Sequence, residues 1–252
     1  MRGGSKRSAR RSTAMVRVFC DFDGTVCPHD IGAQFFRKFA GEQAQGFVEE
    51  LLDGTITMQE WLNRLCGAIP HITREEFNAY VDQFAVDSTF GDFVNFIEEQ
   101  GIPLTVLSDG LDAYVGRVLS NAGLQRVPYF ANHAEFVDSR EGGKLVVSFP
   151  YTDAECRCCG NCKRNHMLVH SADEDIIVYC GDGFSDRCPV RFADFVFAKR
   201  QLIRYCQQQN ITYFEFGQFA DVREKLEQIL QRKRIRHRQE AAMARREIFM
   251  QE

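Results

Sequence analysis

The fold of this chain follows from one stretch near its start, Val16-Arg17-Val18-Phe19-Cys20-Asp21-Phe22-Asp23-Gly24-Thr25. The apolar first half of the stretch predicts a buried strand, and the glycine after the two aspartates predicts a loop directly behind it. Ligands of open α/β sheets bind at the carboxyl ends of the strands. The sequence therefore places Asp21 and Asp23 where such a protein binds its ligand. An EF-hand calcium loop is excluded, because its longer ligand series and terminal Glu do not follow.

Further apolar runs alternate with helical patterns along the chain. Strands are predicted at residues 103–107, 127–131, 144–149, 176–180 and 195–198, and helices at 112–122 and 162–170. This alternation predicts a doubly wound, mainly parallel, Rossmann-like α/β sheet with right-handed crossovers. Residues 31–100 are helical in pattern throughout, with capping boxes at Thr57 and Thr73. We expect them to form a helical insertion between the core segments 16–30 and 101–220.

Both ends of the chain are basic. Residues 1–15 are rich in arginine and serine and contain no acid, so we expect a disordered extension, with an organelle transit peptide as the alternative. Residues 221–252 predict a long, basic C-terminal helix. A solvated helix is favoured there over an RNA, membrane-surface or partner contact, because aromatic residues are not interleaved with the charges.

The composition is that of a globular protein, which excludes disorder of the whole chain. Of the 252 residues, 44% are hydrophobic and 26% are charged. No run of about 18 apolar residues occurs, so no membrane span is expected. A net charge of −4 argues against a strongly basic nucleic-acid binder. Ten cysteines without a recognisable signal peptide favour reduced thiols in a cytoplasmic protein.

Three further polar motifs follow predicted strands or begin a predicted helix. They are Leu107-Ser108-Asp109-Gly110, Gly160-Asn161-Cys162-Lys163 and Gly181-Asp182-Gly183-Phe184-Ser185-Asp186. A serine hydroxyl beside backbone N–H groups suits phosphate oxygens, so we expect the Ser108-Asp109-Gly110 turn to bind phosphate. Lys163 would add a cation to the positive end of a helix dipole. The acids Asp182 and Asp186 are suited to a divalent cation.

In this order the motifs resemble those of the haloacid dehalogenase (HAD) superfamily, specifically the phosphatases of its subfamily IB, over about residues 16–220. The resemblance implies that Asp21 is the nucleophile that attacks phosphorus and that Asp23 is the general acid and base. It also implies that Ser108 and Lys163 hold the transferring phosphoryl group. The helical insertion resembles the type 1 (C1-type) cap of this family.

The resemblance also implies a metal site, which would use Asp21, Asp182 and the backbone carbonyl of Asp23, with Asp186 in support. The metal would be Mg²⁺, which prefers carboxylates, water and phosphate oxygens. Together with Lys163 it would keep the nucleophile ionised and offset its repulsion from the phosphate. An aspartyl-phosphate intermediate would divide one difficult displacement into two easier ones. Asp23 would protonate the leaving alkoxide and then deprotonate water, which favours a raised pKa.

The substrate is expected to be a small phosphorylated metabolite. The stretches 107–114 and 181–199 resemble the phosphatases that act on 2-hydroxy-3-keto-5-methylthiopentenyl-1-phosphate in methionine salvage. Phosphoethanolamine/phosphocholine phosphatases share these features, whereas phosphoserine phosphatases usually have Ser-Gly-Gly in place of Ser108-Asp109-Gly110. Asp30 would either contact a substrate amine or hydroxyl or cap a helix.

Two rival functions stay open at this point. One is a phosphotransferase, which would pass the phosphoryl group to an acceptor other than water. The other is a non-catalytic binding protein built on a HAD core, whose basic C-terminal helix would make the contacts. A degenerate family member of this kind would be expected to lack Asp21 or Asp23, and both are present.

A cluster of thiols precedes Lys163. Its members are Cys156, Cys158, Cys159 and Cys162. Four thiolates can complete a tetrahedral, structural Zn²⁺ site, although such sites more often combine two separated pairs. The alternatives are a disulfide between two of the thiols, or four free thiols. A metal or a disulfide at this position would stiffen the loop that carries the lysine.

Overall fold

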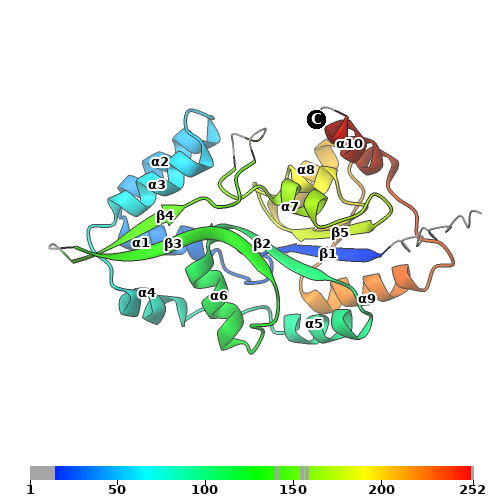
Figure 1. Cartoon of the computed structure of the whole chain (residues 1–252), viewed down its shortest axis with the longest axis horizontal. Coiled ribbons are helices and arrows are strands. Elements are labelled where there is room, and N and C mark those ends of the chain that lie inside the picture. Colours follow the sequence, from blue (N-terminus) through cyan, green and yellow to red (C-terminus); the bar gives the residue numbers. More distant parts are fainter. Residues whose placement is uncertain (1–14, 140–141, 154–155, 157–158, 251–252) are drawn as a thin grey trace, which may run out of the picture.

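The computed structural model describes residues 15–139, 142–153, 156 and 159–250. Its centre is a seven-stranded sheet with the strand order β4-β3-β2-β1-β5-β6-β7 (Figure 1). The strands are β1 (Val16–Asp21), β2 (Leu104–Leu111), β3 (Tyr129–Ser139), β4 (Gly142–Ser148), β5 (Ile176–Gly181), β6 (Phe195–Ala198) and β7 (Tyr213–Glu215). Neighbouring strands are parallel except β3 and β4, which form an antiparallel hairpin at one edge. The predicted doubly wound, mainly parallel α/β fold is thereby confirmed.

The central strands β1 and β5 determine where polar groups can gather. They are parallel neighbours, with Cys20 opposite Cys180, and every residue of β5 is buried. A strand that is covered on both faces has to be apolar along its length. Polar side chains can therefore come together at the ends of the two strands, and Asp21 and Asp182 stand at their carboxyl ends.

Helices cover both faces of this sheet. Figure 1 shows α7 (Lys163–Val169), α8 (Gln201–Gln208) and α10 (Gln239–Phe249) above the strands, and α5 (Phe90–Glu99), α6 (Asp112–Asn121) and α9 (Phe219–Leu230) below them. A short 3-10 helix, η1 (Pro189–Arg191), precedes β6. The ring of Phe219 packs at 4.7 Å from that of Phe90 and at 5.1 Å from that of Phe93. Helix α5 therefore packs with the helices of the sheet, although the predicted insertion over 31–100 includes it.

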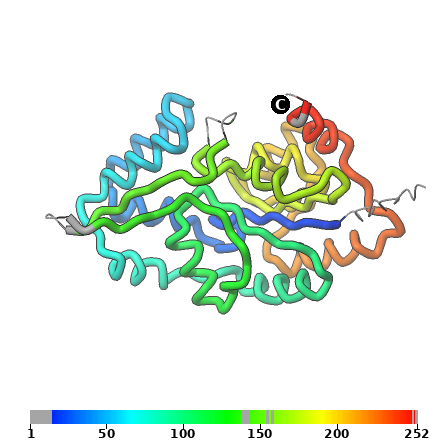
Figure 2. Tube along the Cα trace, viewed as in Figure 1, coloured from blue at the N-terminus to red at the C-terminus, as the bar shows by residue number. Residues whose placement is uncertain are grey.

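The other helices lie beyond the sheet. They are α1 (Ile31–Phe39), α2 (Gln43–Leu52), α3 (Met58–Ala68) and α4 (Arg74–Val81), and they gather around the projecting β3–β4 hairpin (Figure 2). The predicted capping boxes at Thr57 and Thr73 are confirmed. The backbone N–H of Ile72 donates to the carbonyl of Gly143 in β4 at 2.9 Å. The helical insertion is thus supported by a hairpin that the sequence assigned to the core.

The predicted single basic helix over residues 221–252 is wrong. The described chain forms two helices there, α9 and α10, which are separated by irregular backbone over residues 231–238. Like charges stand four residues apart within this connection, and such pairs oppose a helix. The guanidinium of Arg238 instead turns inward and donates to the carbonyl of Val190 at 2.7 Å.

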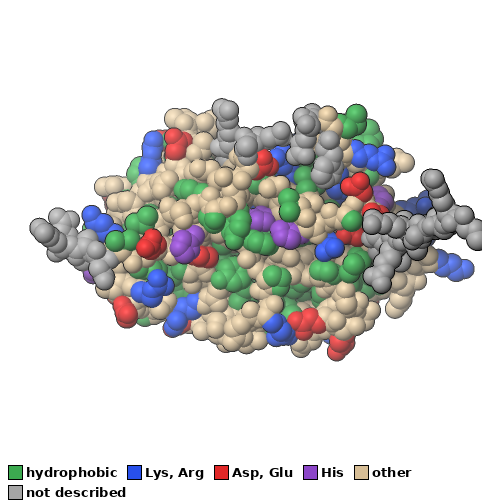
Figure 3. Space-filling view, viewed as in Figure 1, with side chains coloured by type: hydrophobic (Ala, Val, Ile, Leu, Met, Phe, Trp, Pro, Cys, Tyr) green, Lys and Arg blue, Asp and Glu red, His purple; other side chains and the backbone are tan. Residues whose placement is uncertain are grey.

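Surface properties agree with the composition. Lys and Arg side chains are interspersed with Asp and Glu side chains on the face shown in Figure 3. Within the described ranges, no helix is long and apolar enough to cross a membrane. The predicted basic extension lies outside the described residues, except for Met15.

Candidate active site

Three aspartates meet at the carboxyl ends of β1 and β5. Asp21 is the last residue of β1, and Asp182 and Asp186 follow β5. One carboxylate oxygen from each lies within 4.8 Å of the other two. The parallel pairing of the two strands produces this cluster, because it sets their ends side by side. The structure thus brings together three of the residues that the sequence assigned to a metal.

The Lys163 side chain enters the same cluster from the first turn of α7. Its Nζ donates to Asp21 Oδ1 at 2.5 Å, to Ser185 Oγ at 2.8 Å and to Asp186 Oδ1 at 2.9 Å. Burial alone would lower the pKa of Lys163, but the charges of Asp186 and Asp21 outweigh it and hold the pKa well above its usual range. The lysine is therefore a fixed cation beside the predicted nucleophile.

Asp186 is fully hydrogen-bonded within the protein. Its Oδ2 accepts from the backbone N–H groups of Asp182 and Gly183, each at 2.9 Å. Its Oδ1 accepts from Tyr179 Oη at 2.6 Å as well as from Lys163. With both oxygens engaged, Asp186 is built to orient its neighbours, and Asp21 and Asp182 are left as the better metal ligands.

The cluster carries an excess of negative charge. Burial and then the charge of Asp186 raise the pKa of Asp21 well above its usual range, with Lys163 opposing them. The same two causes raise the pKa of Asp182 to about 6. Three carboxylates face two cations, Lys163 and Arg200, so an excess of negative charge remains. Hard carboxylate oxygens with such an excess are a donor set that fits Mg²⁺. The residues present therefore fit the metal that the sequence predicts.

Gly24 allows the aspartates to approach so closely. Its φ is +80°, in the left-handed region that glycine adopts readily. A Cβ at this position would lie 2.2 Å from Asp182 Oδ2 and 2.8 Å from a terminal nitrogen of Arg200. The glycine of the Asp-Phe-Asp-Gly-Thr loop is thus required by the side chain of a residue on another strand end.

Asp23 lies beside the cluster with a different set of contacts. Its Oδ1 accepts from the backbone N–H of Ile31 at 2.8 Å, and its Oδ2 accepts from Tyr114 Oη at 2.6 Å. Burial and then the charge of Asp30 raise the pKa of Asp23 to about 7. A group with this pKa can both donate and accept a proton near neutral pH, as the predicted acid–base role requires.

The predicted phosphate-binding turn lies at the end of β2. Ser108 Oγ is 3.3 Å from Asp23 Oδ2 and accepts from the backbone N–H of Gly110 at 3.0 Å. Asp109 Oδ1 accepts from the backbone N–H of Asn161 at 3.3 Å, and burial raises the pKa of Asp109 to about 6. The turn therefore faces both Asp23 and the loop that carries Lys163.

Comparison with known proteins identifies the family. A family model described as "Putative Phosphatase" matches residues 15–229. The chain belongs to this phosphatase family. It is an enzyme of the phosphoric monoester hydrolase class, and its resemblance to the HAD phosphatases is confirmed.

Two relatives show how far the similarity of this phosphatase extends. A 2-hydroxy-3-keto-5-methylthiopentenyl-1-phosphate phosphatase of Bacillus mycoides (strain KBAB4) is 29% identical over 86% of this chain and 98% of the relative. The bifunctional enzyme MtnB/MtnX of Bacillus licheniformis (strain ATCC 14580) is 29% identical over 92% of this chain. The chain spans about half the length of this second relative, 54%.

Solved structures share the fold of the phosphatase. A phosphoserine phosphatase in a phospho-aspartyl intermediate analogue form matches with a TM-score of 0.60 and 15% identity, over 86% of this chain and 99% of the other. The HAD-family hydrolase t0658 of Salmonella enterica serovar Typhi matches with a TM-score of 0.64 and 17% identity, over 83% and 70% of the two chains.

Several functional side chains of the phosphatase escaped the sequence analysis. Asn161 is fully buried, and its Nδ2 donates to the carbonyls of Ser108 at 2.8 Å and Phe130 at 2.9 Å, which ties the lysine loop to β2 and β3. Arg200 pairs with Asp182 Oδ2 at 3.1 Å. Asn161 belongs to the Gly160-Asn161-Cys162-Lys163 motif, and Arg200 follows the predicted strand at 195–198. Their positions beside a predicted helix start and a predicted strand end were the signals that could have found them.

Two further expectations concern Asp30 and the thiols. Asp30 caps α1, since its side chain accepts from the backbone N–H of Ala33 at 2.8 Å. Cys156 Sγ and Cys159 Sγ are 3.5 Å apart, and Gln59 of α3 donates to the carbonyl of Cys159 at 3.3 Å. Cys158 lies outside the described residues. The cysteine loop therefore connects a helix of the insertion to the segment that carries Lys163.

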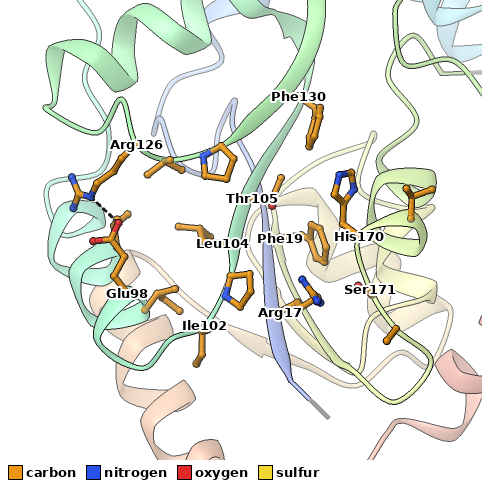
Figure 4. Close-up of a pocket in the computed structure, with 17 residues that line it drawn as sticks. Arg17, Phe19, Glu98, Ile102, Leu104, Thr105, Arg126, Phe130, His170 and Ser171 are labelled. Atoms are coloured by element: carbon orange, nitrogen blue, oxygen red, sulfur yellow. Dashed lines mark hydrogen bonds and ion pairs between the residues drawn. The ribbon is translucent and has the colours of Figure 1, made fainter. Parts of the chain in front are cut away.

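A separate cavity of about 800 Å³ lies toward the amino ends of the strands (Figure 4). Phe19 and Phe130 are among its lining residues, so its wall is largely apolar. Its Arg126 is paired with Glu98 at 2.7 Å. Because ligands of this fold bind at the opposite ends of the strands, the aspartate cluster and not this cavity is the candidate active site.

Proposed function

We propose that this phosphatase hydrolyses a small phosphate monoester through an aspartyl-phosphate formed on Asp21. The observation that carries the proposal is the contact of Lys163 Nζ with both Asp21 and Asp186 inside a cluster of three acids. A cation at this point can neutralise phosphoryl oxygens while the carboxylate attacks phosphorus. Ser108 and the N–H groups of its turn would hold the same oxygens from the side of β2.

The proton transfers are assigned to Asp23. In the first half-reaction, Asp21 forms a bond to phosphorus, the ester P–O bond breaks, and the carboxyl proton of Asp23 moves to the leaving oxygen. In the second half-reaction, a water oxygen attacks phosphorus and the bond to Asp21 breaks. The Asp23 carboxylate takes the proton of that water. A pKa of about 7 supports both tasks.

Asp21, Asp182 and the backbone carbonyl of Asp23 would hold Mg²⁺, with Asp186 orienting Asp182 through its backbone N–H. The bound ion would supply positive charge to the phosphoryl oxygens. The residues of the chain do the remaining work: Lys163 fixes the nucleophile, and Gly24 leaves room for Asp182 beside it.

The proposed substrate is 2-hydroxy-3-keto-5-methylthiopentenyl-1-phosphate. Support comes from two relatives that are named for this activity and that align with the chain over nearly their full length. Phosphoethanolamine, phosphocholine and phosphoserine are the alternative esters. A cytoplasmic location and a division into core, insertion and C-terminal segment belong to the same proposal.

The experiment is a measurement of phosphate release from these four esters, with Mg²⁺ and with EDTA, for the wild type and for Asp21→Asn. We expect release that requires Mg²⁺ and that falls by at least about 10³-fold in the variant, because the nucleophile is lost. Trapping ³²P-labelled protein from a labelled ester would show the aspartyl-phosphate directly. Equal activity of Asp21→Asn and the wild type would contradict the mechanism, and transfer to an added alcohol in place of water would indicate a phosphotransferase.

A structural zinc ion at Cys156, Cys158, Cys159 and Cys162 is a separate part of the proposal. The 3.5 Å contact of Cys156 Sγ and Cys159 Sγ supports it, whereas the three aspartates are the only set of potential metal ligands that the described residues bring together. The test is a metal analysis of the purified full-length protein. One zinc per chain that survives dialysis supports the site, and its absence contradicts it.

A further inference from the structure

Tyr114 is a buried residue that the proposed mechanism has not yet used. It lies in the first turn of α6 and is 1% exposed. Its hydroxyl donates to Asp23 Oδ2 at 2.6 Å, and its ring lies 6.0 Å from that of Phe22 in the catalytic loop. Its hydroxyl therefore meets the proposed site at the Asp23 carboxyl group.

Two glycines leave space for this hydroxyl. A Cβ at Gly110 would lie 1.4 Å from Tyr114 Oη, and a Cβ at Gly32 would lie 3.2 Å from it. Gly110 ends the predicted phosphate-binding turn, and Gly32 lies in the first turn of α1. Even the smallest side chain at Gly110 would therefore overlap the phenol oxygen. Glycines in β2 and in α1 thus leave the space that the Tyr114 hydroxyl occupies.

The two oxygens of Asp23 are held from different sides. The Ile31 N–H donates to Oδ1 from the start of α1, and Tyr114 Oη donates to Oδ2 from α6. Ser108 Oγ lies 3.3 Å from Oδ2, farther than the tyrosine hydroxyl. A carboxyl group held at both oxygens has one orientation, and a proton donor has to be fixed within a fraction of an ångström to act efficiently.

From this geometry we propose that Tyr114 is a positioning residue, which holds the Asp23 carboxyl group toward the leaving-group oxygen of the substrate. The proposal rests on the proposed function, in which Asp23 gives its proton to that oxygen as the P–O bond breaks. Tyr114 keeps its own proton throughout. In the first half-reaction, which kcat/KM reports, the tyrosine therefore matters only for esters whose leaving group needs protonation. The second half-reaction is common to all esters, so any loss there lowers kcat equally for all of them.

The test compares two leaving groups in the full-length protein with Mg²⁺. An alkyl phosphate leaves as a strongly basic alkoxide, whereas 2,4-dinitrophenyl phosphate leaves as a weakly basic phenolate that needs no proton. For Tyr114→Phe we expect kcat/KM for the alkyl ester to fall by about 10- to 100-fold, less than the roughly 10²- to 10⁴-fold that general acid catalysis contributes, because Asp23 itself is retained. For the dinitrophenyl ester we expect a change below about twofold. Activity on the second ester also shows that the variant is folded.

Two further variants make the outcome decisive. Tyr129→Phe is the matched control. The Tyr129 hydroxyl also packs against a glycine of α6, Gly116, and a Cβ at Gly116 would lie 2.4 Å from that hydroxyl. This control should leave both esters unaffected. Asp23→Asn tests the underlying function, since its kcat/KM should fall selectively for the alkyl ester, and more strongly than in Tyr114→Phe. If Asp23→Asn shows this selectivity and Tyr114→Phe does not, the role of Tyr114 is wrong. If neither shows it, the acid–base role of Asp23 is wrong as well.

Discussion

Asp186 and Asp194 are two buried aspartates at opposite ends of β5, and the charge around them differs. Asp194 Oδ2 accepts from the N–H of Ile177 at 2.9 Å, near the start of the strand, whereas Asp186 accepts from two N–H groups just beyond its end. Arg245 pairs with Asp194 at 3.2 Å, and His237 lies at 3.3 Å from it. At this end of β5, Arg245 alone balances the charge of Asp194.

Around Asp186 three acids face two cations, Lys163 and the half-exposed Arg200 that pairs with Asp182. Asp21 and Asp182 share the cluster, and Lys163 contacts Asp21 and Asp186. Both regions are buried and hydrogen-bonded, so burial alone does not distinguish a structural ion pair from a functional site. The charge balance does, because an acidic excess that the protein leaves uncompensated can be offset by a bound cation.

The largest expected effect that tests this comparison is that of Gly24→Ala. A methyl group 2.2 Å from Asp182 Oδ2 would displace either the loop or the ligand. A displacement of about 1 Å in a catalytic site costs about 100-fold in rate, so we expect at least that loss in kcat/KM. Steady-state kinetics and a Mg²⁺ titration would measure it.

The matched control is Gly101→Ala. Its φ is +64°, and nothing lies within 4 Å of the added methyl group. This variant should lose about 1 kcal/mol of stability through backbone strain while keeping its activity. If Gly24→Ala retained the Mg²⁺ dependence and rate of the wild type, the aspartate cluster would not be the cation site.

The next effect is expected at the balanced end of β5. Arg245→Met removes the main cation beside Asp194 and leaves a buried carboxylate without its partner. We expect the free energy of unfolding in urea to fall by about 3 kcal/mol, the cost of breaking a buried pair. The folded fraction should keep wild-type kcat/KM. Arg246→Met, at the exposed neighbouring position, should change neither quantity, and equal stability of the two variants would refute the structural role.

The smallest effect concerns the free energy of unfolding of two variants, Asp182→Asn and Asp194→Asn. We expect the first substitution to raise it and the second to lower it. Asp182 has a pKa raised to about 6, so its ionisation disfavours the folded state, and this loss of stability grows as pH rises through about 6. Asp182→Asn should therefore raise the free energy of unfolding of the metal-free protein, by about 1 kcal/mol at pH 8. Asp194→Asn should lower it. Chemical denaturation at pH 8 and pH 5 in EDTA measures both, and a loss of stability in Asp182→Asn would contradict the acidic excess.

Addition of Mg²⁺ should make the wild type more stable than Asp182→Asn, the reverse of their order in EDTA. A ligand at 100 times its Kd stabilises the folded state by about 2.7 kcal/mol, and Asp182→Asn should gain much less of this. A thermal unfolding series with increasing Mg²⁺ therefore completes the same comparison.

The strand ends were predictable from the sequence because their chemistry is local. Asp21 stands directly after an apolar run and Asp182 one residue beyond another. Parallel pairing brings such ends together whatever the intervening chain does. The capping boxes of α3 and α4 were predictable for the same reason, since both partners lie within three residues.

The contacts that cross between elements were not predictable in this way. Tyr114 reaches Asp23 across 91 positions, and Arg245 reaches Asp194 across 51. In sequence the first resembles any buried tyrosine, and the second resembles one more charge in a basic helix. The break between α9 and α10 also depends on inward contacts of Arg238 that have no local signature.

The β3–β4 hairpin has a consequence for protein engineering. Its first strand pairs with β2 at Tyr129 and with β4 from His133 onward, and β4 hydrogen-bonds to the segment between α3 and α4 through Gly143. A chimera that exchanged only residues 31–89 with a related enzyme would thus leave a native hairpin against foreign helices. Exchanging the insertion between members of this family would require a second exchange, at residues 133–148, made together with the first.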